Sequence, residues 1–192
     1  MTASLTTKSQ KKSLRKDLRL RRKSLALQIP SVKLHHYFKE LPTDILTTNV
    51  IGGFSPIGDE INIWPLLKIL RTEGQRVALP VVTGVDLPLI FREWTPGCEM
   101  ETDQYGVSFP AKGQTLSPQI ILVPLLAFTP QGVRLGYGGG YYDRTLAALR
   151  LKGDVFACGV AYAGQEVAKL PTDAHDERLD GMLTEDGFRK FK

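Results

Sequence analysis

The sequence predicts a single α/β domain in three layers (α/β/α), with a mainly parallel sheet between two layers of helices. Apolar runs typical of buried strands alternate with helical segments, as at residues 49–54, 62–71 and 76–82. Such alternation favours parallel strands, because each crossover helix packs on a face of the sheet. A length of 192 residues suits one domain spanning 1–192, and 42% hydrophobic and 23% charged residues are ordinary for a globular protein.

The remaining elements are expected in this order: a helix at 31–40, a strand at 87–94, a loop-rich stretch at 95–117, a strand at 120–124, a helix at 144–150 and a strand at 154–161. The stretch at 95–117 is of interest because long loops in compact domains often carry function.

Composition argues against several classes of protein. No apolar run approaches the roughly 20 residues that a membrane span needs. Cys98 and Cys158 are too few and too far apart for a disulfide framework, and the three histidines have no zinc-binding spacing. These observations favour a reducing, cytoplasmic setting. No obligate protein partner is evident from the sequence.

The net charge of +5 is concentrated near the N-terminus. Residues 8–23 hold nine Lys or Arg and a single acid, Asp17, whereas the rest of the chain holds 16 basic and 19 acidic residues. The excess of positive charge therefore belongs to the first helix, and the rest of the chain is slightly acidic.

That basic helix is expected at residues 9–28, which contain no Pro or Gly and precede Pro30. We expect residues 1–7 to be disordered. At 100° per residue, an apolar stripe is formed by Leu14, Leu18 and Leu25. One edge of the stripe carries Lys8, Lys11, Arg15 and Arg22, and Arg21 falls on the other side. This cationic edge could border a cleft, or it could be a solvated face.

The most distinctive stretch is residues 134–143, Arg-Leu-Gly-Tyr-Gly-Gly-Gly-Tyr-Tyr-Asp. An apolar run precedes it and a helical segment follows, which predicts a strand–loop–helix unit whose backbone N–H groups can bind an anion. Arg134 adds a planar fork suited to phosphate, and Asp143 could hold Mg²⁺ together with phosphate oxygens. The stretch matches neither the Walker motif nor the dinucleotide fingerprint, and a purely structural glycine turn is the alternative.

Residues 123–144 strongly resemble the signature of the 5-formyltetrahydrofolate cyclo-ligase family, also called 5,10-methenyltetrahydrofolate synthetases. Further matches extend from Lys11 to Glu185. The resemblance implies two small-molecule substrates, ATP and 5-formyltetrahydrofolate, with Mg²⁺ as cofactor. The implied products are 5,10-methenyltetrahydrofolate, ADP and phosphate, formed by phosphorylation of the formyl oxygen and attack by N10.

The resemblance also implies roles for individual residues. ATP contacts are expected from Lys11, Arg15, Arg134, Leu135, Gly136, Tyr137, Gly138, Gly139, Gly140, Tyr141 and Tyr142. Folate contacts are expected from Ser55, Glu60, Tyr105, Tyr137, Gly138, Gly139, Gly140 and Tyr141. Arg134 and Tyr141 are the expected catalytic residues, and Asp143 and Asp176 the expected metal ligands.

Several of these residues also have plainer explanations. Glu60 could simply complement the dipole of the helix that follows it, and Tyr105 and Asp176 could belong to structural or surface turns. Phe109 stands where family members often have an acid or amide, which we interpret as a changed pocket rim.

Two other functions remain as alternatives: a phosphosugar isomerase on a similar scaffold, and a nucleic-acid-binding protein that uses the first helix. The basic helix lacks the aromatic side chains that RNA binding usually adds. We therefore expect no nucleic-acid partner and no membrane partner.

Overall fold

The computed structural model describes residues 2–29, 33–42 and 50–191. Their central feature is an eight-stranded sheet in the order β12-β11-β10-β7-β1-β2-β3-β6. Its strands are β1 (Val50–Gly52), β2 (Arg76–Val81), β3 (Ile90–Trp94), β6 (Thr115–Leu116), β7 (Ile120–Pro124), β10 (Phe156–Val160), β11 (Gly181–Thr184) and β12 (Gly187–Lys190).

Neighbouring strands from β11 to β2 pair in parallel, whereas β12, β3 and β6 pair antiparallel at the two edges. The predicted mainly parallel sheet is confirmed for the centre. The strand expected at 87–94 runs antiparallel to β2, because residues 82–89 contain no helix that could return the chain to the starting edge.

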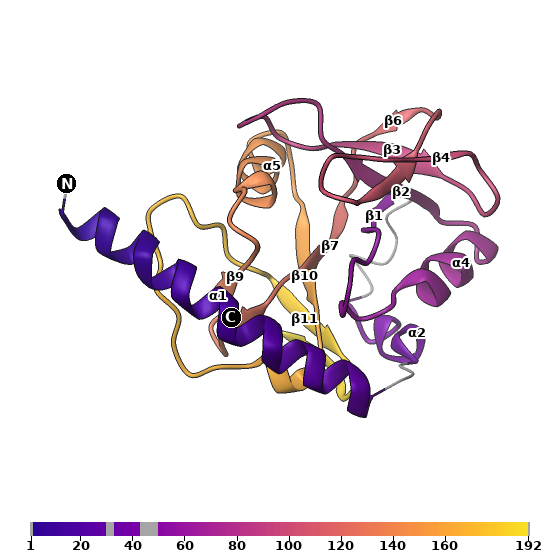
Figure 1. Cartoon of the computed structure of the whole chain (residues 1–192). Helices are drawn as coiled ribbons and strands as arrows, with labels where there is room; N and C mark the ends of the chain where they lie inside the picture. The colour runs from indigo at the N-terminus through magenta and orange to yellow at the C-terminus, as the bar shows by residue number, and fades with distance from the viewer. Residues whose placement is uncertain (1, 30–32, 43–49, 192) are drawn as a thin grey trace.

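Helices cover both faces of this sheet, which confirms the three layers (Figure 1). Two helices, α2 (Leu34–Phe38) and α4 (Trp64–Thr72), pack on one face, and α5 (Tyr141–Arg150) packs on the other. The side chains along β7 show why both faces need to be covered, because they point alternately into two different hydrophobic cores. Ile120 and Leu122 belong to the first core, whereas Ile121 and Val123 belong to the second, so no residue of this run could face solvent.

Smaller elements were not expected from the sequence. The stretch at 95–117 contains a hairpin of β4 (Met100–Thr102) and β5 (Ser108–Pro110). A second hairpin joins β8 (Ala127–Phe128) to β9 (Arg134–Leu135), and β9 forms the beginning of the glycine-rich stretch. A short 3-10 helix, η1 (Ala163–Gln165), follows β10. Residues 31, 32 and 49, predicted within a helix and a strand, lie outside the described residues.

The basic helix α1 (Thr2–Gln28) lies across the outside of the domain, and its N-terminal end projects beyond the sheet (Figure 1). It begins at Thr2 and so extends through residues 2–7, where the sequence led us to expect disorder. Those residues contain no Pro or Gly, and the helix simply continues through them. Among the residues described, no helix combines the length and apolar character of a membrane span.

The predicted apolar stripe is what attaches α1 to the domain. Leu18 is buried against Leu126 and Leu135, and Leu14 packs on the same cluster. Leu25 packs against the core beneath η1, close enough that a Cβ on Gly164 would lie 2.6 Å from it.

We expect Leu18→Ala to lower the free energy of unfolding by about 2–4 kcal/mol, because it leaves a cavity between α1 and the β8–β9 hairpin. Leu20→Ala is the matched control on the same helix, since Leu20 is 64% exposed. It should change stability by no more than about 0.5 kcal/mol. Urea denaturation measures both, and equal effects would contradict the attachment of α1 through this stripe.

Candidate active site

A cavity of about 490 Å³ lies at the carboxyl ends of the central parallel strands. Ser55 follows β1, Val82 follows β2 and Pro124 ends β7, and all three line it. Ligands of open α/β sheets bind at this edge. Every residue named above as an expected ligand of ATP, folate or metal lines this one cavity: Lys11, Arg15, Ser55, Glu60, Tyr105, Arg134, Leu135, Gly136, Tyr137, Gly138, Gly139, Gly140, Tyr141, Tyr142, Asp143 and Asp176.

The glycine-rich loop is shaped by backbone that only glycine adopts easily. Gly138 and Gly140 have φ values of 100° and 68°, and Gly140 caps the start of α5. The helix therefore begins at Tyr141, earlier than predicted, and its first turn carries Asp143. The expected strand–loop–helix unit is present, with the β8–β9 hairpin inserted between strand β7 and the loop.

Arg15 reaches from α1 onto this loop. Its Nε donates a hydrogen bond of 2.9 Å to the carbonyl of Gly136, and a Cβ on Gly138 would lie 3.0 Å from its Cζ. Burial lowers the pKa of Arg15, and the positive charge of Arg19 acts in the same direction. The close contact explains the need for glycine at position 138, where a side chain would displace the guanidinium.

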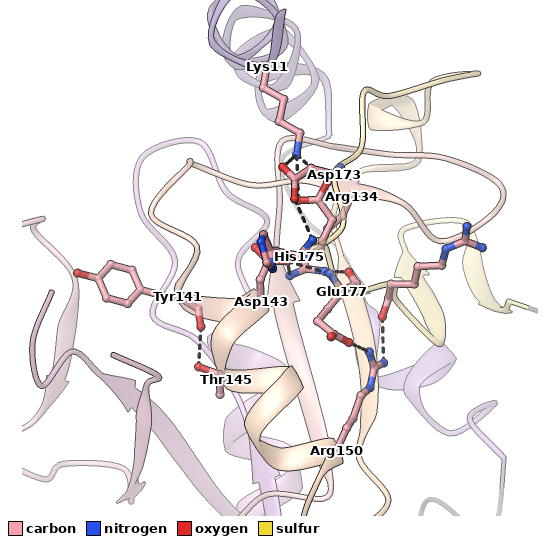
Figure 2. Close-up of polar contacts among 11 residues, drawn as sticks. Lys11, Arg134, Tyr141, Asp143, Thr145, Arg150, Asp173, His175 and Glu177 are labelled. Carbon is pink, nitrogen blue, oxygen red and sulfur yellow. Dashed lines mark hydrogen bonds and ion pairs between the residues drawn. The ribbon is translucent and has the colours of Figure 1, made fainter. Parts of the chain in front are cut away.

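Lys11 is buried and ion-paired with two acids of residues 173–177, a stretch that we call the closing segment. Its Nζ lies 2.9 Å from Asp173 Oδ2 (Figure 2). The same Nζ lies 2.6 Å from Asp176 Oδ2. Burial opposes the charge of Lys11, but the hydrogen bonds to Asp176 and Asp173 outweigh it and raise the pKa. The same contact lowers the pKa of Asp173. The cationic edge predicted for α1 therefore faces the cavity at Lys11 and Arg15, whereas Arg21 is exposed.

The segment that carries these acids is a compact turn. Asp173 N–H donates to Asp176 Oδ2, and His175 N–H donates to Asp173 Oδ1. The sequence left open whether Asp176 belongs to a surface turn or to the site. It belongs to both, because the turn is exposed at His175 while Asp176 lines the cavity.

Arg134 connects the loop to the same closing segment. Its Nη2 lies 2.5 Å from Asp143 Oδ1, and its Nη1 donates to the carbonyl of Glu177. Asp143 Oδ1 also accepts from Glu177 N–H, and Arg150 of α5 pairs with the Glu177 carboxylate (Figure 2). Helix α5, strand β9 and the closing segment are thus joined by a chain of charged groups.

A second buried group of charges lies where the cavity meets α1. The Tyr137 hydroxyl donates to Glu60 Oε1, and Arg22 donates to the Tyr137 hydroxyl. Burial raises the pKa of Glu60, while hydrogen bonds from Tyr137 and from Ile57 N–H and the charge of Arg22 lower it in part. Burial, together with the charge and hydrogen bond of Glu60, raises the pKa of Tyr137. Glu60 is therefore held by specific partners, beyond any effect on a helix dipole.

Aromatic side chains frame the entrance. Tyr105, at the turn between β4 and β5, and Tyr141 have ring centroids 6.2 Å apart, and their hydroxyl oxygens are separated by 3.3 Å. This hydrogen bond raises the pKa of Tyr141, and burial raises the pKa of Tyr142. The expectation that Phe109 alters the pocket rim was wrong. Its ring lies under the guanidinium of Arg92, 5.9 Å from Cζ, and does not line the cavity.

Sequence reasoning missed three charged residues that line or border the site. Arg19 and Asp103 line the cavity, and Asp173 shares Lys11 with Asp176. Arg19 follows Arg15 by one helical turn, so helical spacing could have indicated it. Nothing in the sequence signalled Asp103, whose place depends on the β4–β5 hairpin. Within the described ranges, no group of three or more His, Cys, Asp or Glu side chains is arranged to hold a metal ion.

Comparison with known proteins gives the family. Residues 7–185 match the family model described as the 5-formyltetrahydrofolate cyclo-ligase family. The chain belongs to this family. A 5-formyltetrahydrofolate cyclo-ligase of Haemophilus influenzae is 35% identical over 130 residues, covering 65% of this chain and 69% of the relative. One from Mycolicibacterium smegmatis is 31% identical, covering 72% and 75%.

A solved structure agrees with the family assignment. The 5,10-methenyltetrahydrofolate synthetase of Aquifex aeolicus superposes with a TM-score of 0.74 at 29% identity, covering 95% of this chain and 93% of that one. The match therefore extends over nearly the whole chain.

We expect Lys11→Met to lower the free energy of unfolding at pH 7 by about 1–3 kcal/mol, because it leaves Asp173 and Asp176 facing each other without a cation. The lowered pKa of Asp173 means that its stabilising effect is present above the unfolded value of about 3.9 and is lost as the pH falls through the folded value. The difference between variant and wild type should therefore shrink towards pH 3.5.

The exposed neighbour provides the control for this experiment. Lys12→Met should have little effect at either pH, since its side chain lies on the solvent side of α1. Denaturant titrations at pH 7 and pH 3.5 measure the differences. A loss from Lys11→Met that is the same at both pH values would contradict an electrostatic role for this residue.

Proposed function

We propose that this protein is an ATP-dependent 5-formyltetrahydrofolate cyclo-ligase that forms 5,10-methenyltetrahydrofolate, ADP and phosphate. Family membership supports the reaction. The structural observation that carries the proposal is the pairing of charges in the cavity. Two of the three cations expected to bind phosphate are paired with an acid expected to bind metal: Lys11 with Asp176, and Arg134 with Asp143.

This pairing suits a ligand that brings both signs of charge. A nucleotide bound with a divalent cation offers phosphate oxygens to Lys11 and Arg134 and a positive charge to Asp143 and Asp176. It can therefore replace both ion pairs and leave no buried charge without a partner, which would be costly. An anion alone would take Lys11 and Arg134 and leave Asp143 and Asp176 without these partners.

The reaction needs activation of a poor leaving group. The formyl carbon on N5 belongs to an amide, and its oxygen would have to leave as hydroxide. Transfer of the γ-phosphoryl group of ATP to that oxygen releases ADP and makes the oxygen part of a phosphate ester. N10 then attacks the carbon and loses its proton, and the carbon–oxygen bond breaks with phosphate as the leaving group.

The protein's part in this chemistry is alignment and charge neutralisation, as in other phosphoryl transfers. Lys11 and Arg15 approach the glycine-rich loop from α1, and Arg134 approaches it from β9. The phosphates would lie between them, against the amides of Gly138–Gly140. Tyr141 lies beside this loop, and its hydroxyl is hydrogen-bonded to that of Tyr105. It would hold the reacting groups in line.

The donor set of Asp143 and Asp176 fits Mg²⁺, which commonly binds one or two carboxylates and completes its shell with phosphate oxygens and water. Both described contacts of Asp143 use Oδ1, so Oδ2 remains as an acceptor. Bound Mg²⁺ supplies neutralisation of charge on the transferring phosphoryl group.

The folate would occupy the other half of the cavity. Ser55 follows β1 and Glu60 lies in the turn beyond it, and a carboxylate there can accept hydrogen bonds from the amino-pyrimidinone edge of the pterin. The loop residues between Tyr137 and Tyr141 lie beside both halves, which suits direct transfer from nucleotide to folate. We place the reaction in the cytoplasm, where both cysteines of the chain would remain free thiols.

The purified protein should generate a new near-ultraviolet absorbance from the methenyl bridge when 5-formyltetrahydrofolate, ATP and Mg²⁺ are all present. ADP should appear in equal amount, because one phosphoryl transfer activates one formyl group. 10-Formyltetrahydrofolate is the matched control and should react poorly, since its formyl oxygen is displaced from the γ-phosphate. A folded protein giving neither signal would refute the function, and absorbance without ADP would refute the mechanism.

Asp143→Asn and Asp176→Asn should each raise the Mg²⁺ concentration required for half-maximal rate, by roughly 10-fold or more if a charged ligand is lost. The amide keeps the shape of the side chain while removing its charge. Asp154→Asn, at an exposed acid away from the cavity, is the control and should leave the Mg²⁺ dependence unchanged. A titration of rate against Mg²⁺ that is unaltered in either site variant removes that residue from the proposed metal site.

A further inference from the structure

Arg22 is a buried arginine that stands behind the proposed folate-binding half of the cavity. Its side chain is only 7% exposed, and its Nη1 lies 3.5 Å from Glu60 Oε1 while also donating to the Tyr137 hydroxyl. Its Cζ lies 5.5 Å from the centroid of the Tyr137 ring. A single guanidinium thus contacts two cavity residues at once, one from the turn that follows β1 and one from the glycine-rich loop.

Arg22 itself does not line the cavity, whereas Glu60 and Tyr137 do. It follows Arg15 by seven residues, two turns further along the same edge of α1, yet it acts on the opposite half of the site. A ligand in the cavity therefore experiences Arg22 only through the position and charge of Glu60 and Tyr137.

The chemistry of Glu60 explains why such a cation is needed. The carboxyl is only 5% exposed, and burial favours its neutral form, in which one oxygen carries a proton and no longer accepts. Two neutral donors contact it, the Tyr137 hydroxyl and Ile57 N–H. Among its described hydrogen-bond partners, Arg22 is the one that carries a positive charge.

The Arg22 guanidinium also has one buried donor, Nε, that makes no hydrogen bond within the described residues. A buried donor without a partner destabilises the folded state. The orientation of Arg22 thus satisfies its contacts with Tyr137 and Glu60 through Nη1, while Nε remains unpaired within the described residues.

We propose that Arg22 is a positioning residue for folate recognition: it keeps Glu60 ionised and correctly placed to accept hydrogen bonds from the substrate, with Tyr137 as the bridge between them. The proposal rests on the function proposed above. It assigns to α1 two separable tasks, nucleotide binding through Lys11 and Arg15, and the preparation of Glu60 through Arg22.

Steady-state kinetics with each substrate varied in turn test this proposal. Arg22→Gln should raise KM for 5-formyltetrahydrofolate by roughly 10- to 100-fold, the range expected when a hydrogen-bonded charge is lost, and should change KM for ATP by less than about threefold. Arg22→Lys retains the charge but not the planar fork, so it should recover part of the folate affinity. Arg21→Gln, the exposed neighbour on α1, should behave as wild type.

A double-mutant cycle with Glu60→Gln separates positioning from general stabilisation. If Arg22 acts through the charge of Glu60, then Arg22→Gln should add little to the folate KM of the Glu60→Gln variant, and the two effects should be strongly non-additive. A merely structural arginine would raise both KM values together or would give additive effects, and either result overturns the proposal.

Two further outcomes are informative. Should Arg22→Gln fail to fold, Arg22→Lys carries the test, and KM values for folate and ATP that rise together would then overturn the proposal. An inactive wild-type protein refutes the proposed function itself. An active wild type whose folate KM is unaffected by Arg22→Gln refutes only the role of Arg22.

Discussion

The site depends on the burial of cations from α1 against acids of the domain. A helix with so many positive charges would ordinarily keep all of them in water. Here Lys11 and Arg22 are buried, which is possible because Asp173, Asp176 and Glu60 meet them. Leu18 supplies the apolar contact that brings the helix close, and the ion pairs fix its rotation about its axis. Lys11 and Arg15 face the cavity as a result.

This dependence explains how much of the site could be predicted. The stripe of Leu14, Leu18 and Leu25 fixed one side of α1, and helical geometry then placed Lys11, Arg15 and Arg22 along its edge. The glycines of the loop could be recognised because positive φ at Gly138 and Gly140, and the close approach of Arg15, demand them. Local periodicity and local backbone requirements are properties that a sequence carries directly.

The features that could not be predicted from the sequence depend on contacts between distant segments of the chain. The antiparallel pairing of β2 with β3 follows from a missing helix, and β11 and β12 are too short to show a clear alternation. The neighbourhood of Asp103 is created by the β4–β5 hairpin, which lies in a stretch without periodicity. No pattern within one segment could reveal that Arg22 meets Glu60, because the partner stands 38 residues away in another element.

The ion pair between Lys11 and Asp176 also concerns the order in which the protein is made. Its partners are separated by 165 residues, nearly the whole chain. The first helix leaves the ribosome long before the acid that will hold Lys11 has been synthesised. During that interval α1 has neither Asp176 nor the glycine-rich loop to dock on, and contacts of such long range form late in folding. Completion of the cavity is thus coupled to the synthesis of Asp176, so that a chain truncated before this residue lacks the partner that holds Lys11.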